Sequence, residues 1–165
     1  MLPTDTLTTL FLHNHWANLR LLEQCATLTS EQLNASMTGT YGPIRDTLQH
    51  IATAERSYLS RIITGQPYRR PEGAAPMTLE EMSESLRTSG SGLAEWAAKV
   101  QPDATVQVDW EGTPRQVPKT ILLTQAINHA TEHRAQIMVI LTHLGIQPPE
   151  LDGWTYFDQQ EPLGL

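Results

Sequence analysis

Hydrophobic and polar positions along the chain repeat with the period of an α-helix in four long segments. Apolar or small residues recur every three or four positions, which is typical of helices that bury one face. A shorter segment that begins at Ser30 suggests one additional helical turn. Four long helices joined mostly by short connections predict a four-helix bundle. The expected helices run from Thr6 to Leu28, from Gly42-Pro43 to about Thr64, from Thr78 to about Val100 and from Lys119 to Leu144.

The third predicted helix contains a weak point in the stretch "TSGSG", residues 88–92. Each glycine inside a helix costs up to about 1 kcal/mol relative to alanine. The apolar positions nevertheless keep their phase from Met82 and Leu86 to Leu93 and Ala97. We therefore expect one continuous helix, and a kink or break at Gly90–Gly92 is the alternative.

A different pattern separates the third and fourth helices. Val106, Val108 and Trp110 alternate with polar residues, and Glu111-Gly112 offers a turn before the polar–apolar stretch "RQV". This alternation predicts a small β-hairpin. The expected fold is therefore all-α, a four-helix bundle with one hairpin between helices three and four. With no internal repeat and no second pattern, residues 1–165 form one predicted domain.

Composition and charge exclude several classes of protein. The 165 residues carry a net charge of −7, and the only cluster of basic residues is Arg69-Arg70. Nucleic-acid binding normally needs a basic face, so we expect no nucleic-acid partner. No apolar run approaches the roughly 20 residues that span a bilayer, and the N-terminus lacks the basic start of a signal peptide. Cys25 is the only cysteine, which fits a reducing cytoplasm.

The fourth helix carries histidines where its apolar face should lie. Its expected inward line contains two imidazoles at its centre, one helical turn apart. An unpaired polar group in a core costs roughly 1–3 kcal/mol, so both rings need partners there. Hydrogen bonds would satisfy both rings, and so would a metal ion. The HxxxH spacing alone does not decide between these two alternatives. The line reads Leu122, Ala126, His129, His133, Ile137, Ile140 and Leu144.

A metal site needs a third ligand, and His50 is the best candidate. It lies midway along another long helix, beside the apolar stripe of that helix. His13 and His15 lie near the start of the first helix, and His143 lies at the end of the fourth, where a cation suits the helix dipole. The stretch "HATEH" also differs from the HExxH motif of metalloproteases, because Ala130 stands where the general base would be.

Several polar residues are candidates for contacts around the histidines. Asn14 lies on the inward line of the first helix, and it either reaches the site or is a hydrogen-bonded core amide. Arg134 and Gln136 flank His133 and either orient the ligands or pack against a neighbouring helix. Glu55 is off the face of His50, and we expect it to pair with an arginine.

Oligomeric state is suggested by the first helix and by the tail. Leu12, Trp16 and Leu19 form a second apolar face on the first helix. The tail "LDGWTYFDQQEPLGL", residues 151–165, has three aromatic residues that must pack back on the bundle or meet another subunit. These surfaces predict a homodimer.

Three stretches of the sequence resemble one known family. They are "FLHNHWANLRLLE", "GPIRDTLQHIATAE" and "NHATEHRAQIMVILTHLGIQPPELD", and they occur in the order found in the DinB-like (DinB/YfiT-like) superfamily over nearly the whole chain. The resemblance implies a four-helix bundle in which three histidines bind a divalent metal, usually nickel or zinc, often in a homodimer. Carried onto this chain, the implied ligands are His50, His129 and His133.

The resemblance also suggests a kind of chemistry. Some DinB-like proteins are transferases or isomerases that use a low-molecular-weight thiol, so we expect a metal-dependent enzyme that acts on a small-molecule substrate. Hydrolysis is a second version of this hypothesis. The alternatives are a non-catalytic stress-response bundle that the metal stabilises, and a bundle whose histidines are hydrogen-bonded core residues without metal.

Overall fold

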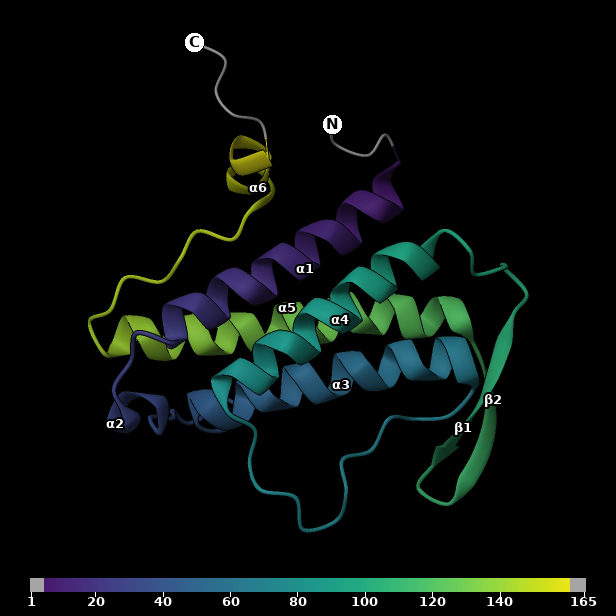
Figure 1. The fold of residues 1–165 in the computed structure, drawn as a ribbon, viewed down its shortest axis with the longest axis horizontal. Coiled ribbons are helices and arrows are strands. Elements are labelled where there is room, and N and C mark those ends of the chain that lie inside the picture. Colours follow the sequence, from purple (N-terminus) through teal and green to yellow (C-terminus); the bar gives the residue numbers. More distant parts are fainter. Residues whose placement is uncertain (1–4, 161–165) are drawn as a thin grey trace.

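The computed structural model describes residues 5–160, which form six helices and one β-hairpin; their arrangement is shown in Figure 1. The last five residues of the aromatic tail lie outside this range. The expected all-α fold is confirmed, with the hairpin between the third and fourth long helices. The elements are α1 (Thr6–Cys25), α2 (Ser30–Leu33), α3 (Ile44–Thr64), α4 (Leu79–Ala97), β1 (Thr105–Trp110), β2 (Thr113–Pro118), α5 (Lys119–His143) and α6 (Gly153–Gln160).

Local sequence explains where several helices begin and end. The carboxylate of Asp5 caps α1 by accepting the backbone N–H of Thr8 at 2.8 Å. Thr78 and Glu81 form a reciprocal capping box at the start of α4. Helix α3 stops at Gly65, which has a left-handed φ of 77° and donates its N–H to Arg61.

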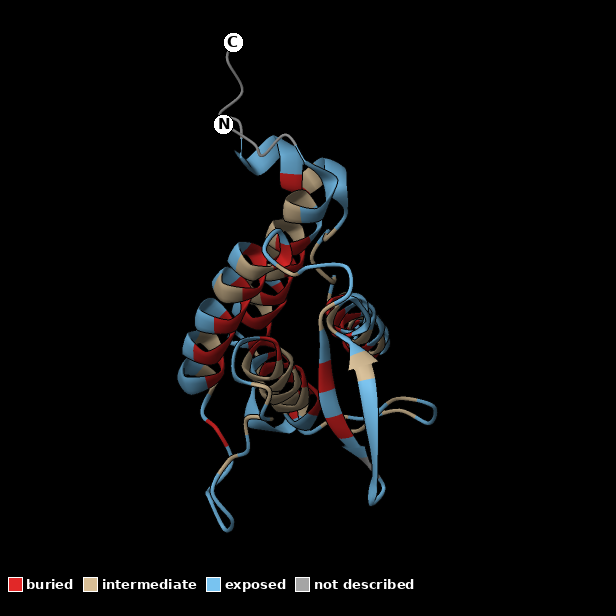
Figure 2. Cartoon of the chain, turned by 90° about the vertical axis from the view of Figure 1, so that its right-hand side faces the viewer, coloured by how far each residue is buried: buried red, intermediate tan, exposed pale blue. Residues whose placement is uncertain are grey.

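The four long helices surround a core that a polar layer divides in two. Helix α4 lies between α1 and α3, and α5 closes the bundle against α3 and, less closely, against α1. Figure 2 shows the buried residues on the sides of the helices that face one another. One apolar cluster lies near α2 and a second lies toward the hairpin. The first includes Leu21, Leu48, Met82 and Ile137. The second includes Phe11, Leu59, Leu93 and Leu122.

Helix α4 is continuous through the glycines that made its middle uncertain. A Cβ atom on Gly90 would lie 2.0 Å from Nδ1 of His15, and one on Gly92 would lie 2.5 Å from Cδ2 of Leu59. Both positions therefore need a residue without a side chain, because α4 approaches α1 and α3 closely there. The two glycines are explained by this close packing and not by a break in the helix. The prediction of a single continuous helix is confirmed.

The predicted hairpin forms an antiparallel pair in which Val106 faces Val117. Its turn uses Glu111 and Gly112, both with positive φ, 52° and 82° respectively. Two successive positive φ values are typical of the tight turns whose twist matches paired strands. Val106 and Val108 are buried and join the second apolar cluster, so the hairpin closes one end of the bundle.

Two features of the C-terminal region differ from the expected pattern. Leu144, the last residue of the predicted inward line, is 36% exposed because the chain leaves the helix at this point. Residues 153–160 form helix α6, which the sequence pattern did not predict. Tyr156 packs against Trp16, with ring centroids 5.4 Å apart, and Trp16 Nε1 donates to Oε1 of Gln159. Part of the tail therefore packs back on α1 and covers part of its second apolar face.

Within residues 5–160, none of the helices combines the length and the apolar character that crossing a membrane requires.

Candidate metal centre

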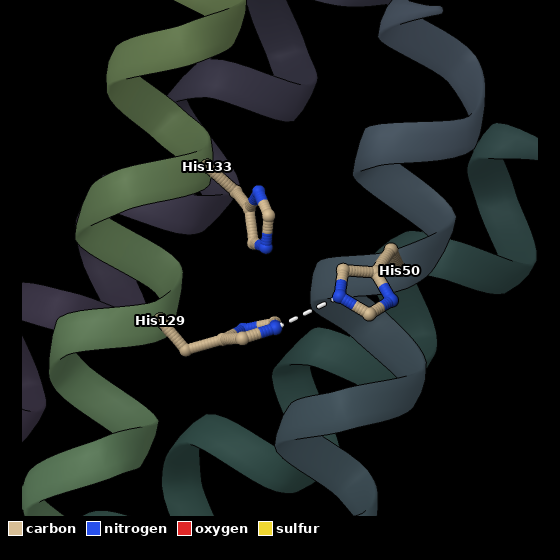
Figure 3. Close-up of side chains that lie close together, drawn as sticks. All are labelled: His50, His129 and His133. Carbon is tan, nitrogen blue, oxygen red and sulfur yellow. Dashed lines mark hydrogen bonds between the residues drawn. The ribbon is translucent and has the colours of Figure 1, made fainter. Parts of the chain in front are cut away.

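Three imidazoles meet across the boundary between α3 and α5. His50 lies in the first half of α3, and His129 and His133 lie one turn apart on α5, so all three side chains point into the same space (Figure 3). One nitrogen from each ring lies within 4.8 Å of the others. Nε2 of His129 is 2.9 Å from Nε2 of His50. His133 is buried, whereas His50 and His129 are half-buried.

The protonation of the cluster suits a metal ion. Two nitrogens that bind one ion at about 2.0–2.1 Å in a tetrahedral site lie about 3.3–3.4 Å from each other, which falls between the 2.9 Å Nε2–Nε2 contact and the 4.8 Å that bounds the cluster. Burial, together with the charges of His133 and His50, lowers the pKa of His129 to about 4. Burial and the charge of His133 also lower the pKa of His50. His50 and His129 are therefore neutral at pH 7, which is the form that ligates a metal.

The cluster has three members within residues 5–160, and no fourth histidine, cysteine or carboxylate of that range joins it. Structural zinc sites are usually closed by four protein ligands, whereas catalytic sites combine three with an exchangeable water or substrate. The donor set therefore matches the open type of site.

Gln136 and two tyrosines surround the cluster. Oε1 of Gln136 lies 2.9 Å from Nδ1 of His133 and also accepts the backbone N–H of Tyr41 at 3.1 Å. The Tyr41 ring is stacked on His50, with centroids 4.1 Å apart and planes 13° apart. The Tyr58 ring lies 5.9 Å from that of His129.

Neither tyrosine was predicted from the sequence to lie at the site. Tyr58 follows His50 by two helical turns, so a helical plot of α3 places it toward the same side. Tyr41 lies in the connection before α3, and the hydrophobic pattern says nothing about the path of a connection. The stretch that runs from α2 to α3 had no signal that would place a ring on a histidine.

Asn14 and Arg134 belong to a group of buried polar side chains that hydrogen-bond to one another and not to the three histidines. Nη1 of Arg134 donates to Oδ1 of Asn14 at 2.7 Å and to Oδ1 of Asn18 at 2.6 Å. The side-chain amides of both asparagines donate to Oε2 of Glu55, at 3.0 and 2.7 Å, and the hydroxyl of Ser89 donates to Oε1 at 2.7 Å. Asn14 is thus a hydrogen-bonded core amide. Of Asn14, Arg134 and Gln136, the three polar residues expected near the histidines, Gln136 alone hydrogen-bonds to one of the three histidines.

The polar layer, which we define as Asn14, Asn18, Glu55, Ser89 and Arg134, connects all four long helices. Burial raises the pKa of Glu55 to about 7, although its hydrogen-bond donors and the charge of Arg134 oppose the shift. Burial also lowers the pKa of Arg134 to about 10, against the effect of Glu55. Glu55 was expected to pair with an arginine. Instead, the two asparagine amides bridge it to Arg134, and no salt bridge joins the two charges in the described part of the chain.

The other histidines lie away from the cluster. Nε2 of His13 is 2.8 Å from the carbonyl oxygen of Leu151, and His13 also contacts Tyr156 of α6. His15 packs against Gly90, and His143 is exposed at the end of α5. The structure thus brings together the same three histidines that the sequence selected and leaves these three apart.

The fold and the cluster define a class of protein: a helical bundle with three histidines that can hold a metal ion, on two of its helices. Comparison with protein families agrees with this class. The model of the DinB family matches residues 1–163, and the chain belongs to the DinB family.

Solved structures support the same fold. The bundle is similar to the crystal structure of a DinB-like protein from Bacillus cereus ATCC 10987, with a TM-score of 0.59 and 22% sequence identity over 84% of this chain and 90% of that chain. At this identity the similarity concerns the fold alone. None of the curated proteins matches the sequence.

Proposed function

We propose that this protein is a metal-dependent enzyme in which His50, His129 and His133 hold a divalent ion, nickel or zinc. The observation that carries the proposal is the convergence of three imidazole nitrogens within 4.8 Å without a fourth ligand from the described residues. A divalent ion at such a site lowers the pKa of a water or thiol that shares it, which supplies a nucleophile at neutral pH.

The protein's own residues determine what reaches this ion. His50 and His129 are half-buried, so part of the cluster is exposed to solvent, and Tyr41 and Tyr58 stand beside them. We propose that a low-molecular-weight thiol is the cosubstrate and that a small electrophile is the substrate, which makes the protein a transferase or isomerase. The resemblance to thiol-dependent DinB-like proteins supports this version, and hydrolysis is the next one to test.

The first experiment measures metal content. We expect about one nickel or zinc ion per chain in protein purified without chelator, because three imidazoles form one site. His129→Ala and His133→Ala should lose the ion. His143→Ala is the matched control, since this histidine is exposed on the same helix and lies outside the three-histidine cluster. An ion content that is the same in all four proteins would exclude the site.

The second experiment tests the reaction. Protein loaded with Ni²⁺ or Zn²⁺ is incubated with several cellular thiols and a generic electrophile, and consumption of free thiol is followed. We expect turnover that His133→Ala abolishes and His143→Ala retains. If no thiol is consumed with either metal, the transferase version is wrong, and release of acid from ester substrates then tests hydrolysis.

A non-catalytic role is the second candidate, and the origin of the ligands favours it. Because the histidines come from α3 and α5 only, a bound ion would join these two helices and stabilise the bundle by mass action. Such a protein would show a melting temperature that rises with metal concentration and no turnover with any substrate class above.

We also propose that the protein is a homodimer. Part of the second apolar face of α1 is covered by α6, but within α6 the side chain of Trp154 is 82% exposed and that of Phe157 is 43% exposed. Light scattering should give twice the 18.4 kDa chain mass. Trp154→Ser should shift the protein toward the mass of one chain.

A further inference from the structure

A histidine that binds a metal through one ring nitrogen usually has its other nitrogen held by a hydrogen bond, which sets the tautomer and the ring orientation. In His133 the contact is between Nδ1 and Oε1 of Gln136, at 2.9 Å. An amide oxygen can only accept, so Nδ1 carries the hydrogen and Nε2 keeps a free lone pair.

The backbone of Tyr41 determines which way the Gln136 amide points. The N–H of Tyr41 lies 3.1 Å from the same Oε1 atom, and a backbone N–H can only donate. Both neighbours therefore need an acceptor, and a carbonyl oxygen with two lone pairs serves both. If the amide were flipped, its NH₂ group would face the N–H of Tyr41. The connection before α3 thus fixes the tautomer of a histidine on α5.

His50 is oriented by a different contact. Within residues 5–160, its Nδ1 atom has no hydrogen-bond partner, and its Nε2 faces His129. The face of its ring is stacked on Tyr41 at a centroid distance of 4.1 Å. The same Tyr41 ring meets His133 edge-on, with centroids 5.1 Å apart. Tyr41 therefore contacts two of the three histidines through its ring and contacts Gln136 through its backbone.

We infer that Gln136 is a positioning residue for two metal ligands. Gln136 orients His133 directly, by setting its tautomer. It orients His50 indirectly, because it holds the backbone of Tyr41 and the ring of Tyr41 restrains the His50 imidazole. This inference rests on the proposed metal function. Gln136 and Tyr41 act together by holding the histidines, and neither of them touches the ion. Stacking on Tyr41 explains how the His50 ring keeps its orientation without a hydrogen bond at Nδ1.

The first test needs no metal. Long-range ¹⁵N–¹H NMR spectra of the imidazoles, recorded at pH 8 on protein stripped with chelator, report the tautomer of each histidine. We expect the Nδ1–H tautomer for His133 in the wild type. Gln136→Leu should convert it to a mixture or to Nε2–H, because leucine cannot accept a hydrogen bond. Gln136→Glu should keep the wild-type tautomer, because a carboxylate oxygen accepts both bonds.

The second test uses Co²⁺ as a spectroscopic probe in the full-length protein. Gln136→Leu should weaken Co²⁺ binding by about tenfold to hundredfold and change the visible absorption bands, and Gln136→Glu should restore both. Tyr41→Phe should behave as the wild type, since the ring and the backbone N–H remain. Tyr41→Leu should change the bands because it removes the stacked ring. Glu132→Gln is the control, an exposed position on the same helix.

The outcomes separate the inference from the proposed function. If Gln136→Leu and Glu132→Gln are both folded by circular dichroism and share the wild-type tautomer and Co²⁺ spectrum, the inference is wrong. If Tyr41→Leu alone keeps the wild-type spectrum, the part that concerns His50 is wrong. If the wild type binds no Co²⁺, the proposed metal function fails, and the tautomer measurement still decides whether Gln136 orients His133.

Discussion

Replacing Arg134 with methionine tests the polar layer that divides the core. The guanidinium donates to Oδ1 of Asn14 and to Oδ1 of Asn18, and it is the positive charge that faces the buried Glu55. Methionine fills a similar volume but donates nothing. The variant therefore leaves two buried amide oxygens without this donor and a buried carboxylate without its counter-charge.

The cost of this substitution follows from those losses. Leaving a buried acceptor unsatisfied costs about 1–3 kcal/mol, and removing one partner of a buried ionic arrangement costs about 3–5 kcal/mol in total. Because these effects overlap, we expect Arg134→Met to lower the free energy of unfolding by about 3–5 kcal/mol. This is a large share of the roughly 5–15 kcal/mol that stabilises a typical domain. Combined with Glu55→Gln, the loss should be about 0.5–3 kcal/mol smaller than the sum of the single losses, because the two groups interact.

Urea unfolding followed by circular dichroism measures these values, with a chelator present so that metal binding does not contribute. Arg20→Met is the control, because Arg20 is exposed on α1 and forms only a surface ion pair with Glu23. We expect its cost to stay within about 0.5 kcal/mol. The reasoning would be refuted if Arg134→Met cost no more than this control, or if the two single losses were additive.

Three further predictions follow from the core and from the tail. Gly90→Ala should destabilise the protein by about 1–3 kcal/mol through overpacking, despite the gain of up to about 1 kcal/mol in helix propensity. Ser91→Ala, at the neighbouring exposed position, should not destabilise it. The urea unfolding midpoints of the two variants test this difference. The pKa of Glu55 is raised to about 7 from an ordinary value of 4.5, so its contribution to stability is complete below about pH 4.5 and is lost as the pH rises through 7. The stability of Glu55→Gln relative to wild type should therefore rise between pH 5 and 8, and parallel urea curves over this range would contradict the raised pKa. Tyr156→Ala should release α6 from Trp16, which hydrogen exchange would detect as faster exchange in residues 153–160, with protection in the four long helices unchanged.

Periodicity was enough to predict the four long helices and the histidine cluster. His129 and His133 fall on the inward line of α5, and His50 lies beside the stripe of α3, so two regular helices carry all three side chains to one place. A helix converts sequence spacing directly into spatial position, which is why this part of the site followed from the residues.

Contacts that depend on connections could not be predicted in the same way. The position of Tyr41 depends on the path between α2 and α3, and α6 follows a proline-containing stretch whose direction no periodicity describes. The polar layer was also missed as a unit, because its hydrogen bonds join four helices whose relative rotation the sequence does not state. Glu55 was expected to lie off the face of His50, and this is confirmed, but the face that Glu55 occupies points to the centre of the bundle.

All three histidines belong to α3 and α5, while α1 and α4 contribute none of them. Substitutions along the boundary between α3 and α5 can therefore alter the surroundings of the histidines, while the other two helices maintain the scaffold. With this division, the side chains beside the cluster can change without requiring a new way to fold.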